Sequence, residues 1–84
     1  MVADLGIARR LAETRALLAW DEVVGVPLAQ QARPLRVARG RLEVAVSSAA
    51  WRTQLSFVQK EIVVRLNRAA GETVINELVL LNRR

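Results

Sequence analysis

The order of apolar and polar residues divides the chain into helical and extended segments. Residues 5 to about 24 contain no proline and are rich in helix-forming residues, which predicts a first helix. One stripe of this helix consists of Leu5, Ala8, Ala12, Ala16, Ala19 and Val23, and an adjoining stripe consists of Ile7, Leu11 and Leu18. Together the two stripes form a wide apolar face, which we expect to be buried.

Gly25 and Pro27 interrupt this pattern and indicate a second, short helix through about Gln31. Proline suits the first turn of a helix, because its missing amide proton is not needed there. Pro34 biases the residue before it away from helical geometry, which ends the segment. The sequence therefore predicts a hinge at Gly25 between two helices.

Residues 35–39 and 41–47 flank a single glycine, Gly40, and predict a β-hairpin. In the second run, Leu42, Val44 and Val46 alternate with Arg41, Glu43, Ala45 and Ser47. This alternation is typical of a strand with one buried and one solvent-exposed face.

A long helix is predicted from about residue 49 to residue 70, with Ser47 or Ser48 as its N-cap and Gly71 at its end. Its expected buried stripe is Trp51, Leu55, Val58, Ile62, Leu66 and Ala69. The residues expected to face away from the core are Arg52, Ser56, Gln59 and Asn67.

Residues 74–81 predict a closing strand that is apolar on both faces. Such a strand is either central in its sheet or covered by something outside this chain. The order α-α-β-β-α-β predicts one small α+β domain over residues 1–84, with helices on one face of a three-stranded sheet. A chain of 84 residues has room for one thin core.

Composition narrows the classes of function. The chain has no cysteine and no histidine, which excludes disulfides, thiol nucleophiles and zinc sites of the cysteine and histidine type. Ser47, Ser48 and Ser56 therefore have no histidine as a base, and the only lysine, Lys60, has no obvious desolvating pocket. We expect a protein that is not an enzyme and that holds no cofactor.

The longest uncharged stretches, residues 23–32 and 44–51, are far shorter than the roughly 20 residues of a membrane helix. The first ten residues lack the apolar run of a secretory signal. We therefore expect a cytoplasmic protein without a membrane partner.

The net charge is +5, and a compact group of basic residues lies at the predicted hairpin. Four basic residues occur there without an intervening acid: Arg33, Arg36, Arg39 and Arg41. Alternate side chains of a strand project together, so this group predicts a positive surface that binds phosphates. The alternative is a charged edge strand that discourages aggregation.

A second basic group lies on the predicted long helix and consists of Arg52, Lys60, Arg65 and Arg68. These residues are candidates for nucleic-acid contact, or they are a solvated helix face. Glu61 and Arg65 have the spacing and order of a stabilising ion pair within a helix, so part of this charge is expected to support the helix.

Several apolar residues are candidates for contact with a partner protein. Trp51 falls on the apolar stripe and is expected in the core, whereas Trp20 is either core or an anchor for a partner. Phe57 and Val64 lie roughly opposite the main stripe, so either the first helix covers them or they form an exposed binding patch. Val79 and Leu81 on the last strand pose the same question, and edge-strand pairing into a homodimer is a further option.

An ordered set of residues along nearly the whole chain resembles a known pattern. It comprises Trp20, Val24, Gly25, Leu28, Ala29, Gly40, Leu42, Val44, Val46, Ser48, Trp51, Leu55, Leu66, Asn67 and Gly71. In this order and spacing they resemble the DUF721 family, whose members act as DciA-type operators of the bacterial replicative helicase.

The resemblance implies a fold similar to a K-homology domain and a role in loading the replicative helicase on single-stranded DNA. The four glycines of the chain form no Gly-x-x-Gly pair, so the nucleotide clamp of a true K-homology domain is missing. We expect a nucleoid-associated replication adaptor that binds the helicase and touches single-stranded DNA through the basic hairpin. The alternative is a module that binds an acidic or helicase partner without contacting nucleic acid.

Overall fold

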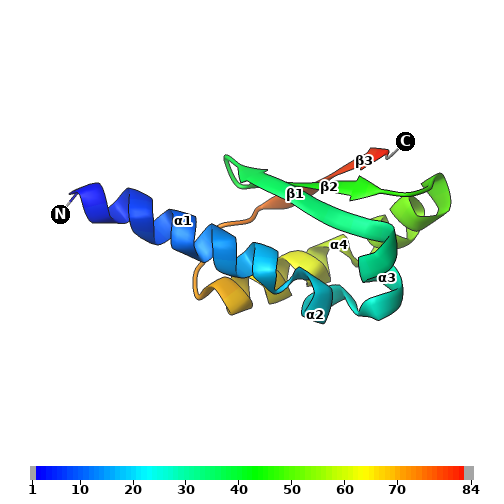
Figure 1. Ribbon diagram of the computed structural model, residues 1–84, viewed down its shortest axis with the longest axis horizontal. Helices are drawn as coiled ribbons and strands as arrows, with labels where there is room; N and C mark the ends of the chain where they lie inside the picture. Colours follow the sequence, from blue (N-terminus) through cyan, green and yellow to red (C-terminus); the bar gives the residue numbers. More distant parts are fainter. Residues whose placement is uncertain (1, 83–84) are drawn as a thin grey trace.

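The computed structural model describes residues 2–82, with side chains from residue 6 onward, and confirms the predicted α+β class. Within this range the elements are α1 (Val2–Leu18), α2 (Trp20–Val24), α3 (Val26–Gln31), β1 (Ala32–Ala38), β2 (Arg41–Val46), α4 (Ala49–Ala70) and β3 (Glu77–Asn82). Figure 1 shows the sheet as one layer with all of these helices on the same side.

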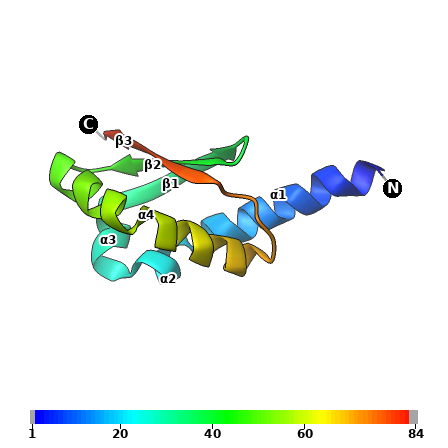
Figure 2. The same cartoon turned by 180° about the vertical axis from the view of Figure 1, so that it is seen from behind.

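The three strands lie in the order β1-β2-β3. β1 and β2 form an antiparallel hairpin, whereas β3 runs parallel to β2. Parallel neighbours cannot be joined by a tight turn, so the chain must cross over the sheet between β2 and β3. α4 makes this crossover and thereby covers the inner face of the sheet, as seen from behind in Figure 2.

The core lies between α4 and the inner face of the sheet. Leu42, Val44 and Val46 of β2 are fully buried, as the alternating pattern predicts, and they pack in one cluster with Leu55 and Leu66 of α4. Trp20 belongs to the same cluster, and its indole Nε1 donates a hydrogen bond of 2.9 Å to the Ala32 carbonyl oxygen. The one polar atom of this large side chain is therefore satisfied inside the core.

The expectation of a wide buried face on the first helix is wrong. Ala12 and Ala16 are buried, but Ile7, Leu11 and Leu18 are 60%, 53% and 80% exposed. Alanine side chains allow α1 to approach α4 closely, while the opposite side of α1 has no neighbour among the described residues. The helix also breaks at Ala19, so that α2 begins as a separate short helix at Trp20.

The predicted ends of the long helix are confirmed. The Ser48 side chain accepts a hydrogen bond of 3.2 Å from the Trp51 amide, and Gly71 has a left-handed φ of 84°. These are the common N-terminal and C-terminal caps of an α-helix.

The hairpin turn consists of Arg39 and Gly40, both with positive φ (54° and 79°). Two consecutive positive φ angles are the requirement of a type I′ turn, whose twist matches that of the flanking strands. The Gly40 carbonyl oxygen accepts a hydrogen bond of 2.7 Å from the backbone N–H of Asn76, which links the turn to the residue before β3. A Cβ atom at Gly40 would collide with the side-chain amide of Asn76.

The outer strands differ in extent from the prediction. β1 begins at Ala32 rather than residue 35 and includes Pro34, next to an irregularity in its pairing with β2. Proline is tolerated there because β1 is an edge strand. β3 begins at Glu77 rather than residue 74, because Glu77 pairs with Arg41, the first residue of β2, and earlier residues have no strand partner there. Val74 and Ile75 are buried in the loop before β3.

Two polar residues of α4 hold this loop and β3, although both were expected to face away from the core. Asn67 accepts from the amides of Val74 and Ile75 at 3.0 and 2.9 Å, and its Nδ2 donates to the Ile75 carbonyl oxygen at 2.9 Å. Gln59 donates to the Leu78 carbonyl oxygen at 2.9 Å. The helical wheel separates apolar from polar positions, but it does not reveal polar contacts to a later segment of the chain.

Candidate interaction surfaces on the sheet and the long helix

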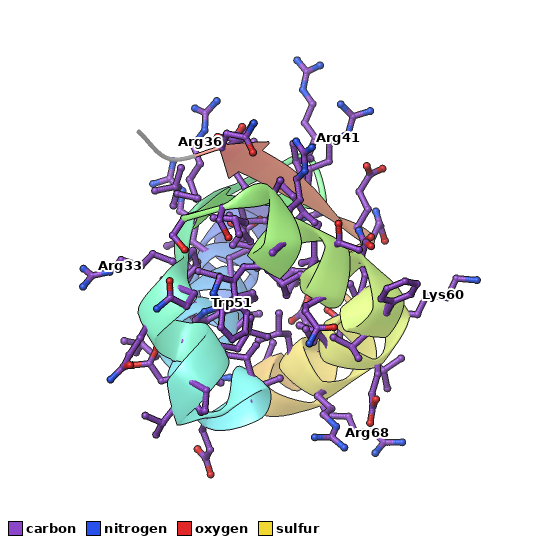
Figure 3. All side chains as sticks on the ribbon, turned by 90° about the vertical axis from the view of Figure 1, so that its right-hand side faces the viewer. Arg33, Arg36, Arg41, Trp51, Lys60 and Arg68 are labelled. Carbon is purple, nitrogen blue, oxygen red and sulfur yellow. The ribbon has the colours of Figure 1, made fainter. Side chains whose placement is uncertain are left out.

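The outer face of the sheet, opposite the helices, carries three of the four hairpin arginines. The strand register aligns Arg33 with Ala45, Arg36 with Glu43, and Arg41 with Glu77, all on the side opposite the buried residues of β2. In Figure 3, Arg36 and Arg41 lie above the sheet, whereas Arg33 points sideways from its edge. Arg39 lies in the turn. The four side chains therefore do not project together as one row.

Acidic residues on the same face neutralise part of this charge. Arg36 binds Glu43 through two hydrogen bonds, with Nε to Oε1 at 3.0 Å and Nη2 to Oε2 at 3.2 Å. This hydrogen bond, together with the charge of Glu43, raises the pKa of Arg36 above its usual value. Arg41 Nε lies 3.8 Å from Glu77 Oε2. Across residues 6–82, no carboxylate lies within ion-pairing distance of Arg33 or Arg39.

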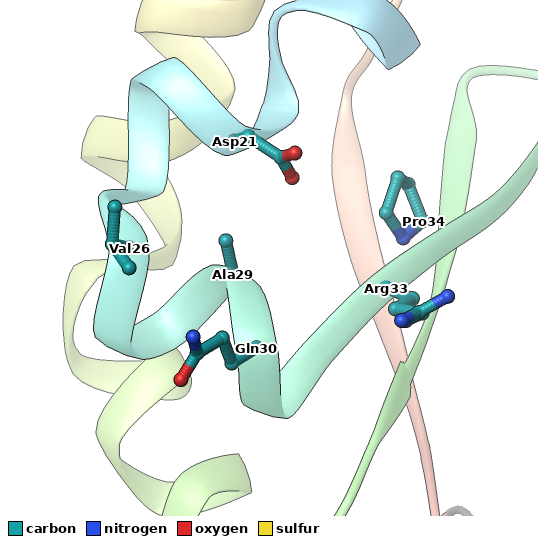
Figure 4. A pocket seen from close by; sticks show the side chains of 6 residues that line it. All are labelled: Asp21, Val26, Ala29, Gln30, Arg33 and Pro34. Atoms are coloured by element: carbon teal, nitrogen blue, oxygen red, sulfur yellow. The ribbon is translucent and has the colours of Figure 1, made fainter.

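A shallow pocket beside Arg33 contains both charge signs. Figure 4 shows that it opens between α2, α3 and the start of β1. Its lining consists of Asp21, Val26, Ala29, Gln30, Arg33 and Pro34. Because Asp21 lines the same pocket, the positive field of Arg33 is weakened there, and the pocket lacks the uniform positive charge of a phosphate site.

The basic residues of α4 lie on other sides of the molecule. Arg65 pairs with Glu61 at 2.7 Å, which confirms the predicted pair within the helix. Arg52, Lys60 and Arg68 are exposed and belong to none of the ion pairs found among the described side chains. Figure 3 shows Lys60 and Arg68 pointing away from Arg36 and Arg41. The structure thus does not gather the two predicted basic groups into one patch.

An apolar stripe on the outer side of α4 is open to solvent. Phe57 is 78% exposed and Val64 is 49% exposed, so of the two alternatives, cover by the first helix is wrong and an exposed patch is what the structure shows. α1 reaches the core through Ala12 and Ala16. Beside Val64 lies a groove between α4 and the loop before β3, lined by Gln59, Lys60, Val63, Val64, Asn76 and Glu77. Exposed aromatic and aliphatic groups beside a groove are typical of a protein-binding surface.

The remaining candidates for partner contact differ in accessibility. Trp20 is 1% exposed, so of its two alternatives the core position is confirmed, and contact with a partner does not hold for the folded chain. Trp51 is half-buried against the core cluster, as expected. Val79 is half-buried and Leu81 is 39% exposed, and both lie on the outer face of β3.

Sequence reasoning missed the acids of the outer face. Glu43 and Glu77 are placed there by the strand register, and the alternation in β2 already assigned Glu43 to the same face as Arg41. The sequence thus indicated the face of Glu43, but the pairing of Glu43 with Arg36 depends on the irregularity after Pro34.

Within residues 2–82, no helix combines the length and apolarity needed to cross a membrane.

Comparison with known proteins identifies the family. The sequence model of the family described as "Dna[CI] antecedent, DciA" matches residues 1–80. The chain belongs to the DciA family. Curated relatives are UPF0232 proteins of Mycobacterium bovis (37% identical over 73 residues), Rhodococcus jostii (34% over 73) and Mycolicibacterium smegmatis (33% over 76). The matches cover 87%, 87% and 90% of this chain but 39% of each relative, so the chain spans about two fifths of their length.

In this DciA-family chain, residues of the recognised pattern support the fold. Trp20 fills the core, Gly40 forms the hairpin turn, Ser48 and Gly71 cap α4, and Asn67 ties α4 to β3. The exposed arginines and Phe57 are not part of that pattern. The family resemblance therefore rests on the scaffold, and the surfaces of this chain have to be argued separately.

Proposed function

We propose that this chain is the folded domain of a cytoplasmic replication adaptor that binds the replicative helicase and promotes its loading on single-stranded DNA. The observation that carries this proposal is the family match over residues 1–80, with its description as antecedent of Dna[CI]. The role is one of binding without catalysis, in line with the lack of histidine and cysteine.

The helicase-binding surface that we propose is the outer stripe of α4. Phe57 is 78% exposed and so contributes little to the packing of the domain, and Val64 with its neighbouring groove adds further apolar area on α4. A large exposed aromatic side chain can be desolvated by a partner and then contributes much of the binding free energy. Val79 and Leu81 form a second, smaller candidate on the sheet.

Direct DNA contact is the finer part of the proposal. Among the side chains of residues 6–82, Arg33 and Arg39 of the hairpin and Arg52, Lys60 and Arg68 of α4 are the basic candidates that belong to no ion pair. Exposed ion pairs contribute little to stability, so phosphates can compete with Glu43 and Glu77 for Arg36 and Arg41. If four phosphates are contacted, log affinity falls against log salt with a slope of about −2.8, and with two phosphates the slope is about −1.4.

The first experiment measures helicase binding and loading. The chain is mixed with the replicative helicase of its host, and helicase occupancy on a labelled single strand is followed with and without the chain. We expect Phe57→Ser with Val64→Ser to weaken binding by about tenfold or more, and Thr53→Ser, a matched exposed change on α4, to leave it unchanged. Failure of the unaltered chain both to bind the helicase and to change its occupancy overturns the proposal.

A second candidate is a protein-interaction module that does not bind DNA. The pairing of Arg36 with Glu43 and of Arg41 with Glu77 favours it, since these contacts reduce the positive field of the hairpin. Titration with a labelled single-stranded oligonucleotide at low salt separates the two candidates. A saturable signal that charge reversal of Arg36, Arg39 and Arg41 weakens supports DNA contact through the hairpin. If no saturable signal is found, the module that binds protein without DNA is the candidate that remains.

A further inference from the structure

The exposed side of α1 carries a regular apolar stripe that the domain does not use. Ile7, Leu11 and Leu18 are 60%, 53% and 80% exposed. With the exposed Thr14 they follow the spacing i, i+4, i+7, i+11, which aligns side chains along one side of a helix. This is the spacing of the seam in a two-stranded coiled coil. The buried residues of the same helix, Ala12 and Ala16, lie on a different side.

The first half of α1 has little contact with the rest of the domain. Residues 6–11 are all exposed. Figures 1 and 2 show this part of the helix projecting beyond the sheet and α4. Short helices are marginal in water unless an amphipathic face is packed. A partner laid along the stripe would supply that packing and would bury the three large side chains at the same time.

Charges beside the stripe define the partner. In the heptad set by Ile7, Leu11, Thr14 and Leu18, the residues that flank the seam are Ala8, Arg10, Arg15 and Leu17, and the charged ones among them are both arginine. Neither arginine takes part in an ion pair within residues 6–82, since the nearby pair on α1 joins Arg9 and Glu13. The flanks are therefore positive and available to acidic side chains.

The same charges argue against a second copy of this chain as the partner. In a parallel pair of α1 helices, Arg10 of one copy faces Arg15 of the other. In an antiparallel pair aligned on the middle of the stripe, Arg10 lies near Leu17 and Arg15 near Ala8 of the other copy, so no opposite charges join the two helices. Like charges oppose the parallel pair and no opposite charges support the antiparallel one, whereas a partner with glutamate or aspartate at the flanking positions attracts both arginines.

We propose that the Ile7, Leu11 and Leu18 stripe of α1 binds an amphipathic helix of another protein, with an apolar seam flanked by acidic residues. The mode is helix-on-helix recognition, in which spaced apolar side chains give affinity and flanking charges select the partner. This inference does not rest on the proposed function, because the surfaces assigned there are the outer sides of α4 and of the sheet.

The test uses two synthetic amphipathic peptides that differ only in flanking charge. Each has about three heptads with leucine at the seam positions, and the flanking positions carry glutamate in one and lysine in the other. Binding of each labelled peptide to the 84-residue chain is measured by fluorescence anisotropy. We expect the glutamate peptide to bind about tenfold or more tightly than the lysine peptide. Equal binding of the two peptides overturns the proposal.

Variants assign the binding to this surface. Leu11→Ser with Leu18→Ser removes binding of the glutamate peptide, whereas Phe57→Ser on α4 leaves it unchanged. Arg10→Glu with Arg15→Glu reverses the preference toward the lysine peptide. All of these positions are exposed, so circular dichroism is expected to show an intact fold for each variant. A failure of charge reversal to change the preference, or an equal loss with Phe57→Ser, contradicts the assignment.

Two further measurements separate this proposal from its alternatives. Hydrogen exchange of the α1 amides is expected to slow when the glutamate peptide binds, because the projecting turns become packed. Solution mass is expected to be that of a monomer, and a dimer that Leu11→Ser disperses would assign the stripe to a second copy. If the variant Leu11→Ser with Leu18→Ser still binds the helicase, the proposed function holds, even when neither peptide binds to α1.

Discussion

The inner face of the sheet is uniformly apolar, whereas the outer face of the same strands mixes charge and apolar surface. The inner residues Leu42, Val44, Val46 and Leu78 are all buried. The outer residues are Arg33, Arg36, Arg41, Glu43, Glu77, Val79 and Leu81. Burial demands one type of side chain, but solvent exposure permits many. The inner face therefore determines the fold, and the outer face is where a function of this chain can be varied without unfolding it.

The largest effect is expected from truncating the inner face. Leu42→Ala removes a fully buried side chain and leaves a cavity, so the free energy of unfolding should fall by about 2–5 kcal/mol. Leu81→Ala, on the outer face at 39% exposure, is the matched control and should cost less than about 1 kcal/mol. Chemical denaturation of both variants measures the difference. Equal losses would mean that the outer face is covered in solution and tolerates substitution no better than the inner face.

The next largest effect is expected from removing the hydrogen bonds that link α4 to β3 and to the loop before it. Asn67→Ala removes three hydrogen bonds to Val74 and Ile75 and should lower the free energy of unfolding by about 1–3 kcal/mol, because backbone groups lose their partners. Gln59→Ala removes one bond to the Leu78 carbonyl oxygen and is expected to cost less. Denaturation midpoints measure both variants. A larger loss for Gln59→Ala would show that the assignment of Asn67 as the main link is wrong.

The buried face of the sheet and the ends of the long helix could be predicted from the sequence. Strand alternation identified Leu42, Val44 and Val46 as buried, and the caps Ser48 and Gly71 defined the ends of α4. These features depend on local spacing and local backbone geometry, which a sequence displays directly.

Features that depend on long-range geometry were less predictable. The apolar stripe of Ile7, Leu11 and Leu18 was expected in the core, since spacing alone does not say which of two apolar stripes meets a neighbour. The pairing of Arg36 with Glu43 depends on the strand register and the irregularity after Pro34. The outer face and the free side of α1 are therefore the parts that required the structure.

A smaller effect is expected from the charge balance of the outer face. Glu43→Gln removes the partner of Arg36 while keeping the size of the side chain. Stability should change little, because exposed ion pairs are weak. Affinity for single-stranded DNA should rise, and the salt slope should steepen by about 0.7, since one more arginine becomes available to phosphate.

Glu72→Gln is the matched control, because Glu72 belongs to no ion pair within residues 6–82. Oligonucleotide titrations at several salt concentrations provide the slopes. Identical slopes for Glu43→Gln and the unaltered chain would remove Arg36 from the DNA-binding surface. The raised pKa of Arg36 implies stability that persists up to a strongly basic pH and is lost only above it, so no pH effect of this pair is expected near neutrality.

The smallest effect is expected at the hairpin turn, where charge and backbone geometry can be separated. Arg39 has a φ of 54°, a conformation that asparagine adopts more readily than arginine. Arg39→Asn should therefore stabilise the fold by under about 1 kcal/mol while removing one positive charge from the hairpin. If Arg39 contacts a phosphate, the salt slope becomes shallower by about 0.7 although the protein is more stable. Thermal unfolding and the oligonucleotide titration measure the two changes independently, and a flatter slope accompanied by lower stability would mean that the turn does not have the assigned geometry.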